Sequence, residues 1–155
     1  MKRAQVLASA LLLLAACDAR PQIDSLEGQV VVGAEHCNWT PIDDAKPEIF
    51  DGKQGLLVQE GIGVSVSFDA FSIEDVNEPE ELDGFWTMVS GDPLVAEAFS
   101  GPNNTIAIIA HAPGTAILTL TLVGIVETVE VPIVVVPADE FEPNPDGAGG
   151  EGGGV

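Results

Sequence analysis

Two histidines and a cysteine are the side chains of this sequence best suited to bind a transition metal. His36 and Cys37 are adjacent, Glu35 precedes them, and His111 lies far along the chain. Imidazole and thiolate are common zinc ligands, but neighbouring residues of an extended segment point to opposite sides. His36 and Cys37 therefore do not readily face one ion, and we interpret them as ordinary loop residues.

Two acidic segments carry side chains of the kind that bind calcium. The first contains the alternating residues Glu142, Asn144 and Asp146, followed by Gly147. Prolines separate them, and Gly153 stands at the twelfth position, where a calcium loop normally carries a bidentate glutamate. The second segment is a dense run made of Glu74, Asp75, Glu78, Glu80, Glu81 and Asp83. We interpret both as solvated charge and predict neither a metal site nor a cofactor site.

No arrangement of side chains points to catalysis. The chain has neither a G-x-S-x-G nor an H-E-x-x-H motif, and it has no glycine-rich phosphate loop after a strand. Carboxylates are too plentiful for one pair to be singled out as an acid–base couple. We therefore predict a protein that is not an enzyme and has no catalytic residues.

The charge of the chain excludes nucleic acid as a partner. Three basic and 25 acidic residues follow residue 16, which gives that part a formal charge of −22. No lysine or arginine occurs after Lys53. Phosphate binding requires a basic surface, and this composition cannot supply one. We attribute the acidity to solubility and mutual repulsion on an exported surface, with divalent-cation binding as the alternative.

The first 17 residues indicate an exported, lipid-anchored protein. Lys2-Arg3 precedes an apolar run from Val6 to Ala16, which is too short to span a bilayer and is laid out like a secretory signal. The run ends in Leu14-Ala15-Ala16-Cys17, which resembles the lipobox of bacterial lipoproteins. In that family the signal is cleaved before the cysteine, which then carries lipid chains. The resemblance implies lipid attachment, palmitate included, at Cys17; an ordinary cleaved signal is the alternative.

Lipidation of Cys17 has a consequence for the second cysteine. Cys37 then has no partner within the chain, because the sequence contains two cysteines in all. It is either a buried small hydrophobe or a thiol for a link to another molecule. Several acyl chains anchor a protein stably, so we expect a tethered protein that does not span the membrane.

The rest of the chain is dominated by apolar residues at alternate positions. Period-two alternation bounded by glycine, proline and asparagine predicts half-buried antiparallel strands. The expected extended segments are 29–33, 55–60, 62–68, 84–90, 94–99, 105–111, 115–122 and 126–136. Residues 69–83 are expected to form an acidic loop, with a short helix as the alternative. Pro132 should lie at a sheet edge or where its missing N–H is not needed. Short strands with regular turns predict an antiparallel sandwich.

Local motifs add a family resemblance over residues 55–136. In order, the chain has Glu60-Gly61, Trp86, then Ser90-Gly91-Asp92-Pro93-Leu94-Val95-Ala96, and finally Ala112-Pro113-Gly114-Thr115-Ala116. This series resembles the bacterial Ig-like group 2 domain, and so implies an Ig-like β-sandwich. The pattern makes physical sense, because Asp-Pro starts a tight turn after which Val and Ala re-enter the core. Gly-Thr-Ala would permit an abrupt strand entry beside the bulky Trp86.

These observations predict four parts and one class of function. The parts are a signal peptide (1–16), a lipidated tether (17–27), an all-β Ig-like sandwich (28–137) and a disordered acidic, glycine-rich tail (138–155). By analogy with the Ig-like family, we expect a non-catalytic module of the bacterial cell envelope, on the periplasmic or surface face, that serves interaction, adhesion or spacing. Its expected partners are the membrane, through the anchor, and an envelope or surface protein or polysaccharide. The alternative is a cation- or carbohydrate-binding accessory subunit of an envelope complex.

Overall fold

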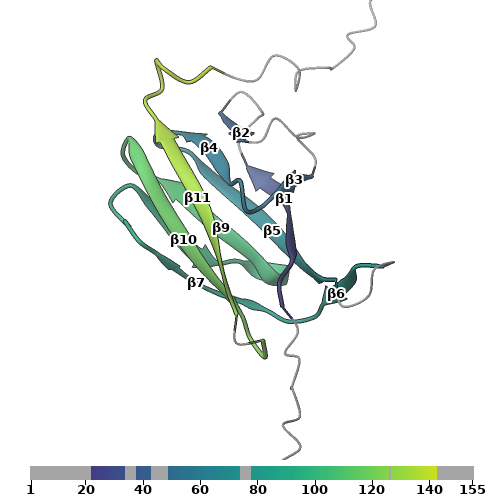
Figure 1. Cartoon of the computed structure of the whole chain (residues 1–155). Helices are drawn as coiled ribbons and strands as arrows, with labels where there is room; N and C mark the ends of the chain where they lie inside the picture. Colours follow the sequence, from purple (N-terminus) through teal and green to yellow (C-terminus); the bar gives the residue numbers. More distant parts are fainter. Residues whose placement is uncertain (1–21, 34–37, 43–48, 74–77, 126, 143–155) are drawn as a thin grey trace, which may run out of the picture.

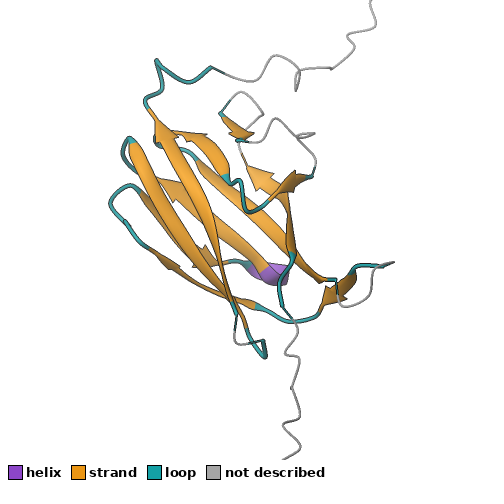
Figure 2. Cartoon of the chain, in the orientation of Figure 1, coloured by secondary structure: helices purple, strands orange, loops and turns teal. Residues whose placement is uncertain are grey.

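The computed structural model describes residues 22–33, 38–42, 49–73, 78–125 and 127–142. They form two β-sheets packed face to face (Figures 1 and 2). Sheet A has the strand order β3-β1-β5-β9-β8, with β6 paired to the end of β5, and sheet B has the order β2-β4-β11-β10-β7. Within the described ranges, the turn at Pro102–Asn104 is the sole helical element.

The strands vary in length from two to ten residues. Their bounds are Ser25–Gly33 (β1), Trp39–Pro41 (β2), Phe50–Asp51 (β3), Leu56–Gln59 (β4), Gly63–Ser72 (β5), Glu80–Leu82 (β6), Trp86–Ser90 (β7), Ala96–Ser100 (β8), Thr105–Ala110 (β9), Gly114–Leu122 (β10) and Thr128–Val136 (β11).

The pairing of the strands is that of an immunoglobulin-like sandwich. In sheet A, β1, β5, β9 and β8 take the places of strands A, B, E and D of that fold. In sheet B, β7, β10 and β11 take the places of strands C, F and G. β4 pairs with β11 in parallel, whereas the other paired strands are antiparallel. The predicted all-β, Ig-like fold class is confirmed; membership of the group 2 family stays a prediction.

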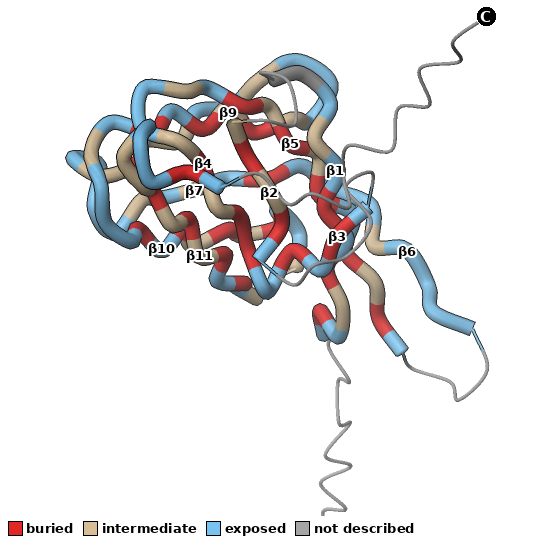
Figure 3. The backbone as a smooth tube through the Cα atoms, turned by 90° about the horizontal axis from the view of Figure 1, so that it is seen from above, coloured by how far each residue is buried: buried red, intermediate tan, exposed pale blue. Residues whose placement is uncertain are grey.

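The core follows the alternation read from the sequence. On β10 and β11 the buried residues are Ala116, Leu118, Leu120, Leu122, Val129, Val131, Ile133 and Val135. On β5, Val64, Val66 and Phe68 are buried on the inner face of sheet A. Figure 3 shows this as buried segments alternating with half-buried and exposed ones along the strands. Each large side chain buried in this way contributes about 1.5–3 kcal/mol of transfer free energy.

Trp86 is the buried tryptophan of strand β7. Its side chain is 4% exposed, and its Nε1–H donates a 2.8 Å hydrogen bond to the carbonyl of Phe68 on β5. Ser67 is the last residue of β5 that pairs with β9, so the next carbonyl along the strand can accept a bond from the indole. An apolar ring with a satisfied N–H is how tryptophan is buried at low cost.

The Asp92-Pro93 turn carries the chain from sheet B to sheet A. The Asp92 carbonyl accepts hydrogen bonds from the N–H groups of Val95 and Ala96 at 3.1 and 3.0 Å. The side-chain Oδ1 of Asp92 accepts a hydrogen bond from the Leu94 N–H at 3.1 Å. Ala96 is fully buried, as the turn motif predicted.

The prediction that the strand entry at Gly114 lies beside Trp86 is wrong, because the residue next to Gly114 is Val95. Gly114 has φ 150°, and a Cβ there would lie 3.0 Å from Cγ2 of Val95. The glycine therefore makes room for the turn before β8. Trp86 pairs instead with Leu122 at the opposite end of β10.

The folded part extends past both predicted boundaries. Ile23 and Leu26 are 5% and 1% exposed, and β1 begins at Ser25, so residues 22–27 belong to the sandwich and not to the tether. At the other end, Phe141 is 9% exposed and the Glu140 N–H donates to the Pro137 carbonyl at 3.1 Å. Isolated apolar residues in polar segments give no periodicity, which is why both extensions were missed. Residues 1–21 and 143–155 lie outside the described part.

The acidic segment 69–83 is not simply a loop. β5 continues to Ser72, and β6 pairs with its last three residues. The inward positions of this extension are Ala70 and Ser72, both buried. Because these inward side chains are small and one is polar, the sequence shows no apolar alternation there, and its acidic residues favour the prediction of a loop. Residues 74–77 lie outside the described part.

Pro132 takes the second of its two predicted placements. β11 is a central strand, and Pro132 lies opposite Ile117 of β10. The Gly91 N–H donates to the Ile117 carbonyl, so the backbone groups of Ile117 face β7 and this pair needs no bond of its own. The nitrogen of Pro132 thus faces the β4 side, where pairing starts only at Ile133 and Leu56.

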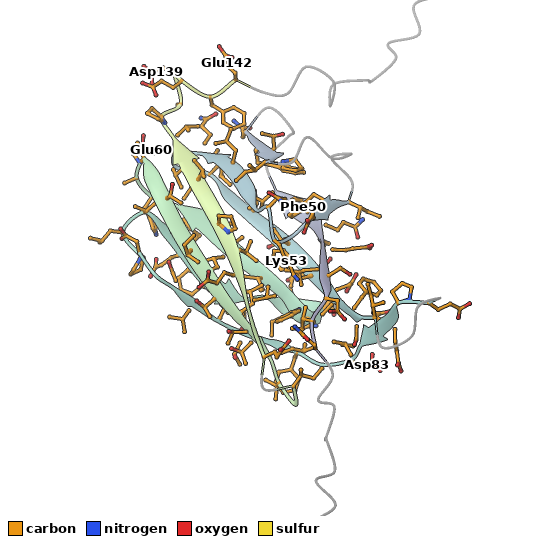
Figure 4. All side chains as sticks on the ribbon, viewed as in Figure 1. Phe50, Lys53, Glu60, Asp83, Asp139 and Glu142 are labelled. Carbon is orange, nitrogen blue, oxygen red and sulfur yellow. The ribbon has the colours of Figure 1, made fainter. Side chains whose placement is uncertain are left out.

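The described chain enters and leaves at opposite ends of the sandwich (Figure 1). The Ile23 N–H donates to Glu127 Oε2 at 2.7 Å, beside the β10–β11 turn. Asp139 and Glu142 lie beyond the far end of β11, on the side of Glu60 (Figure 4). The nine residues of β11 place these ends roughly 30 Å apart.

Candidate interaction surface

Most of the transition-metal candidates named from the sequence lie outside the described residues. Glu35, His36 and Cys37 lie outside the described residues, as does Cys17. The Nε2 atom of His111 is 2.9 Å from Oε2 of Glu97, and the two side chains are 42% and 43% exposed. This is a surface pair that joins β8 to the start of the β9–β10 turn.

The acidic runs also form no described site. Of the first run only Glu142 is described, and it is exposed. Of the second, Glu78, Glu80, Glu81 and Asp83 are described, and all are exposed. Across the described ranges, no group of three or more His, Cys, Asp or Glu side chains is arranged to hold a metal ion.

Strand pairing does align three carboxylates that the sequence keeps far apart. On the outer face of sheet A, Glu27 of β1 lies opposite Asp51 of β3 and opposite Asp69 of β5. Directly opposed residues have Cβ atoms about 5 Å apart, so the row concentrates negative charge. A reading of the sequence alone could not find it, because it depends on the register of three strands.

A shallow hollow lies beside this row. Its volume is about 310 Å³, and it is lined by Asp24, Ser25, Leu26, Glu27, Ile49, Phe50, Asp51 and Lys53. Nζ of Lys53 donates to the carbonyls of Ile23 and Asp24 at 3.2 and 2.7 Å. The hollow therefore holds the one lysine or arginine of the described residues, and this lysine fastens the start of β1.

Exposed apolar side chains gather at the opposite edge of the sandwich, on β7, β8, the turn between them and the strands next to them. The described part exposes eleven large apolar residues, and seven are of this group. We call these seven the apolar edge: Phe85, Val89, Leu94, Phe99, Ile109, Ile117 and Val123. Leu94, at the tip of the turn, is 81% exposed, and Val89 is 69% exposed.

The register of the strands brings members of this group together in pairs. On sheet B, Val89 lies opposite Thr119, which makes Ile117 its diagonal neighbour on the outer face. On sheet A, Phe99 lies opposite Ala107 and is the diagonal neighbour of Ile109. The turn that carries Leu94 connects the two faces. The apolar edge therefore has members on the outer faces of both sheets and on the turn between β7 and β8.

Few carboxylates lie at the apolar edge, and those of Asp92 and Glu97 already have hydrogen-bond partners. Two carboxylates lie on β8 and the turn before it: Asp92 accepts the Leu94 N–H, and Glu97 lies 2.9 Å from His111. A third, the exposed Asp83, lies two residues before Phe85. The other described acids lie mainly on β1, β3, β5 and β6 and around the C-terminal segment. Figure 4 shows Glu60, Asp139 and Glu142 at one end of the sandwich and Asp83 near β6. The described part of the chain thus has an apolar edge at β7 and β8 and most of its carboxylates on other strands and at the C-terminal segment.

The sequence did carry a signal for this surface. From Phe85 to Phe99, apolar residues occupy both the inward and the outward positions of the strands. An inward residue such as Trp86 belongs to the core, so its apolar neighbours Phe85 and Val89 must face outward. Reading the two parities separately would have predicted an exposed apolar edge.

The comparisons with known proteins identify no family. No protein-family model matches the sequence, and no curated protein matches it. The fold is similar to that of domains 4 and 5 of the S-layer protein SbsC, with a TM-score of 0.39 and 18% identity over 53% of this chain and 47% of the other. Domains 5–6 of SbsC give a TM-score of 0.38 with 20% identity over 51% of this chain and 38% of the other. The chain spans less than half the length of either structure.

No helix among the described residues is both long enough and apolar enough to span a membrane.

Proposed function

We propose that this protein is a lipid-anchored, non-catalytic module of the bacterial envelope that binds a partner through its apolar edge. The observation that carries the proposal is the clustering of seven of the eleven exposed large apolar residues on that edge. Exposed apolar side chains gathered on one part of a domain favour an interaction site, because burial recovers about 25 cal/mol for each Å² removed from water.

The distribution of charge supports the same surface. A partner that approached β1, β3 or β6 would bury carboxylates such as Asp69 or Asp83, which is costly unless it supplied cations. At the apolar edge, Asp92 and Glu97 already have hydrogen-bonded partners. The expected partner therefore presents apolar surface and needs no basic patch.

The anchor rests on the lipobox resemblance at Cys17. Because the sandwich begins by Ile23, only residues 18–22 separate the lipidated cysteine from the fold. Such a segment spans at most about 20 Å when extended, so the sandwich would lie close to the bilayer. The far end of β11 would then point away from the N-terminal attachment, which also suits a spacer.

The interaction is tested by chemical crosslinking in intact cells followed by purification of the protein. Val89→Asp and Leu94→Asp place charge on the apolar edge without touching the core, and should remove the crosslinked partner. Ile73→Asp is the matched control, because Ile73 is 56% exposed but lies at the end of β5. Equal recovery from all three variants would exclude the apolar edge as the binding surface.

Two further experiments separate the parts of the proposal. Cys17→Ser should abolish palmitate incorporation and membrane fractionation, and unchanged labelling would refute the anchor. Calorimetric titration with calcium addresses the alternative of a cation-binding accessory subunit. Heat of binding together with a raised melting temperature would favour that alternative, whereas neither is expected for an apolar interaction module.

A further inference from the structure

The two strands at the apolar edge are also the end strands of their sheets. β7 ends sheet B and β8 ends sheet A, so each strand has one row of backbone groups that pairs with no other described strand. Such rows are templates for the addition of another strand. Whether these backbone groups are available therefore decides whether a partner can bind at this edge by adding a strand.

The register shows which backbone N–H and C=O groups of β7 point away from β10, toward the unpaired side of the strand. Phe85 accepts a hydrogen bond from the Val123 N–H at 3.0 Å, and Gly91 donates to Ile117 at 2.9 Å. Hydrogen-bonded pairs alternate with unbonded ones in an antiparallel ladder. The N–H and C=O groups of Trp86, Met88 and Ser90 thus face away from β10.

The side chain of Asn104 occupies the first part of this open row. Its Oδ1 accepts the Trp86 N–H at 3.1 Å, and its Nδ2 donates to the Gly84 carbonyl at 3.0 Å. An acceptor and a donor spaced to match residues i and i+2 of a strand reproduce what the backbone of an added strand would offer. The primary amide of Asn104 therefore stands in for one residue of a neighbouring strand.

The β8–β9 turn is built to hold Asn104 in this place. Asn103 and Asn104 have φ values of 54° and 60°, in the left-handed region, which asparagine tolerates better than most residues. The turn is closed by Gly101, whose N–H donates to the Thr105 carbonyl at 2.7 Å. The Thr105 hydroxyl in turn donates to the Pro102 carbonyl at 2.7 Å.

β8 is protected at the corresponding position. The backbone groups of Ala96, Ala98 and Ser100 point away from β9, because those of Val95 and Gly101 form hydrogen bonds on the β9 side. The Ala96 N–H donates to the Asp92 carbonyl at 3.0 Å, and the Ala96 carbonyl accepts the Ser90 hydroxyl at 2.6 Å. On both end strands, the first of the three residues on the unpaired side already has a hydrogen-bond partner for its N–H.

We infer that Asn104 blocks strand addition to β7, so that the apolar edge takes partners through side chains and not by extension of sheet B. The rest of this row on β7 consists of the Trp86 carbonyl, Met88 and Ser90, and a short row gives little support to an added strand. β8 also lies beside it, since the Ser100 hydroxyl is 3.7 Å from Sδ of Met88. The block is a property of the fold itself. It deepens the proposed function at the same edge, but its test does not require that a natural partner be found.

Asn104→Gly tests the block, because glycine keeps the left-handed backbone while it removes the amide. Asn103→Gly is the matched control: it makes the same change one residue away, at a side chain without a role on β7. Purified full-length protein in nonionic detergent and reducing buffer is used for all variants. At a dilution where all variants are monomeric, the Trp86 amide of Asn104→Gly should exchange with deuterium about tenfold faster than in the control. Light scattering should show self-association that increases with concentration.

A double variant distinguishes edge pairing from partial unfolding. Met88→Pro removes the N–H that faces the open edge and leaves the pairing with β10 intact. Added to Asn104→Gly, it should abolish the self-association. The inference is overturned if the Trp86 amide exchanges equally in both glycine variants, if Asn104→Gly stays monomeric, or if its association persists with Met88→Pro.

Discussion

The Nε1–H of Trp86 on β7 donates a 2.8 Å hydrogen bond to the carbonyl oxygen of Phe68 on β5, and so ties sheet B to sheet A through the core. The two residues are 18 positions apart in the sequence. The bond forms because β9 stops covering β5 at Ser67, one residue before the acceptor.

Loss of this bond should destabilise the fold measurably. Trp86→Phe keeps an aromatic ring but leaves the Phe68 carbonyl without its indole donor, which we expect to cost about 1–3 kcal/mol of unfolding free energy. Chemical denaturation followed by fluorescence of the remaining Trp39, or by circular dichroism, measures the change. Phe85→Leu, at the exposed neighbouring position, should change the stability by less than about 0.5 kcal/mol. Equal losses in the two variants would contradict the role of the bond.

Two glycines with similar backbone angles should respond differently to alanine. Gly55 has φ 85°, and a Cβ there would lie 1.9 Å from the Pro132 carbonyl oxygen, whereas Gly61 has φ 80° and no atom within 4 Å. Gly61→Ala should cost about 1 kcal/mol from its left-handed backbone alone. Gly55→Ala should cost about 3 kcal/mol or more, because β4 must also move away from β11. Thermal unfolding of both variants checks the difference, and similar melting temperatures would refute the close approach.

The carboxylate row of sheet A should lower stability at neutral pH. Glu27 lies between Asp51 and Asp69 on neighbouring strands, so Glu27→Gln removes repulsion from both sides and should stabilise the fold by about 0.5 kcal/mol. The gain should shrink in high salt, which screens exposed charges. Glu130→Gln is the control, since Glu130 lies opposite Thr119. Urea denaturation at two salt concentrations measures the effect; a loss of stability in Glu27→Gln would show that the row is favourable.

Phe141 should anchor the end of the folded domain. It is 9% exposed but lies outside the core cluster of the sandwich, so Phe141→Ala should cost about 2 kcal/mol, less than a substitution in that cluster. Glu142→Ala should leave the stability unchanged. Truncation after Pro137 should reproduce the loss, and truncation after Glu142 should not. Identical melting temperatures for the two truncated chains would place the boundary back at Pro137.

The sequence predicted the sandwich and its core because alternate apolar positions in β5, β10 and β11 report directly which face each residue takes. It could not predict features that depend on register. The row of Asp51, Glu27 and Asp69 comes from three strands whose pairing no local pattern encodes. Likewise, Asn104 looks like any turn residue until β7 is placed beside it. Phe141 and Ile23 were missed because single apolar residues carry no period.

The most direct test of the central claim, that the apolar edge is the binding surface, is site-specific photocrosslinking in living cells. A diazirine amino acid is introduced at Leu94, which is 81% exposed, and in a second strain at Ile73, which is 56% exposed. If partners bind at the apolar edge, Leu94 should give a discrete crosslinked product and Ile73 none. A product from Ile73 without one from Leu94 would contradict this claim.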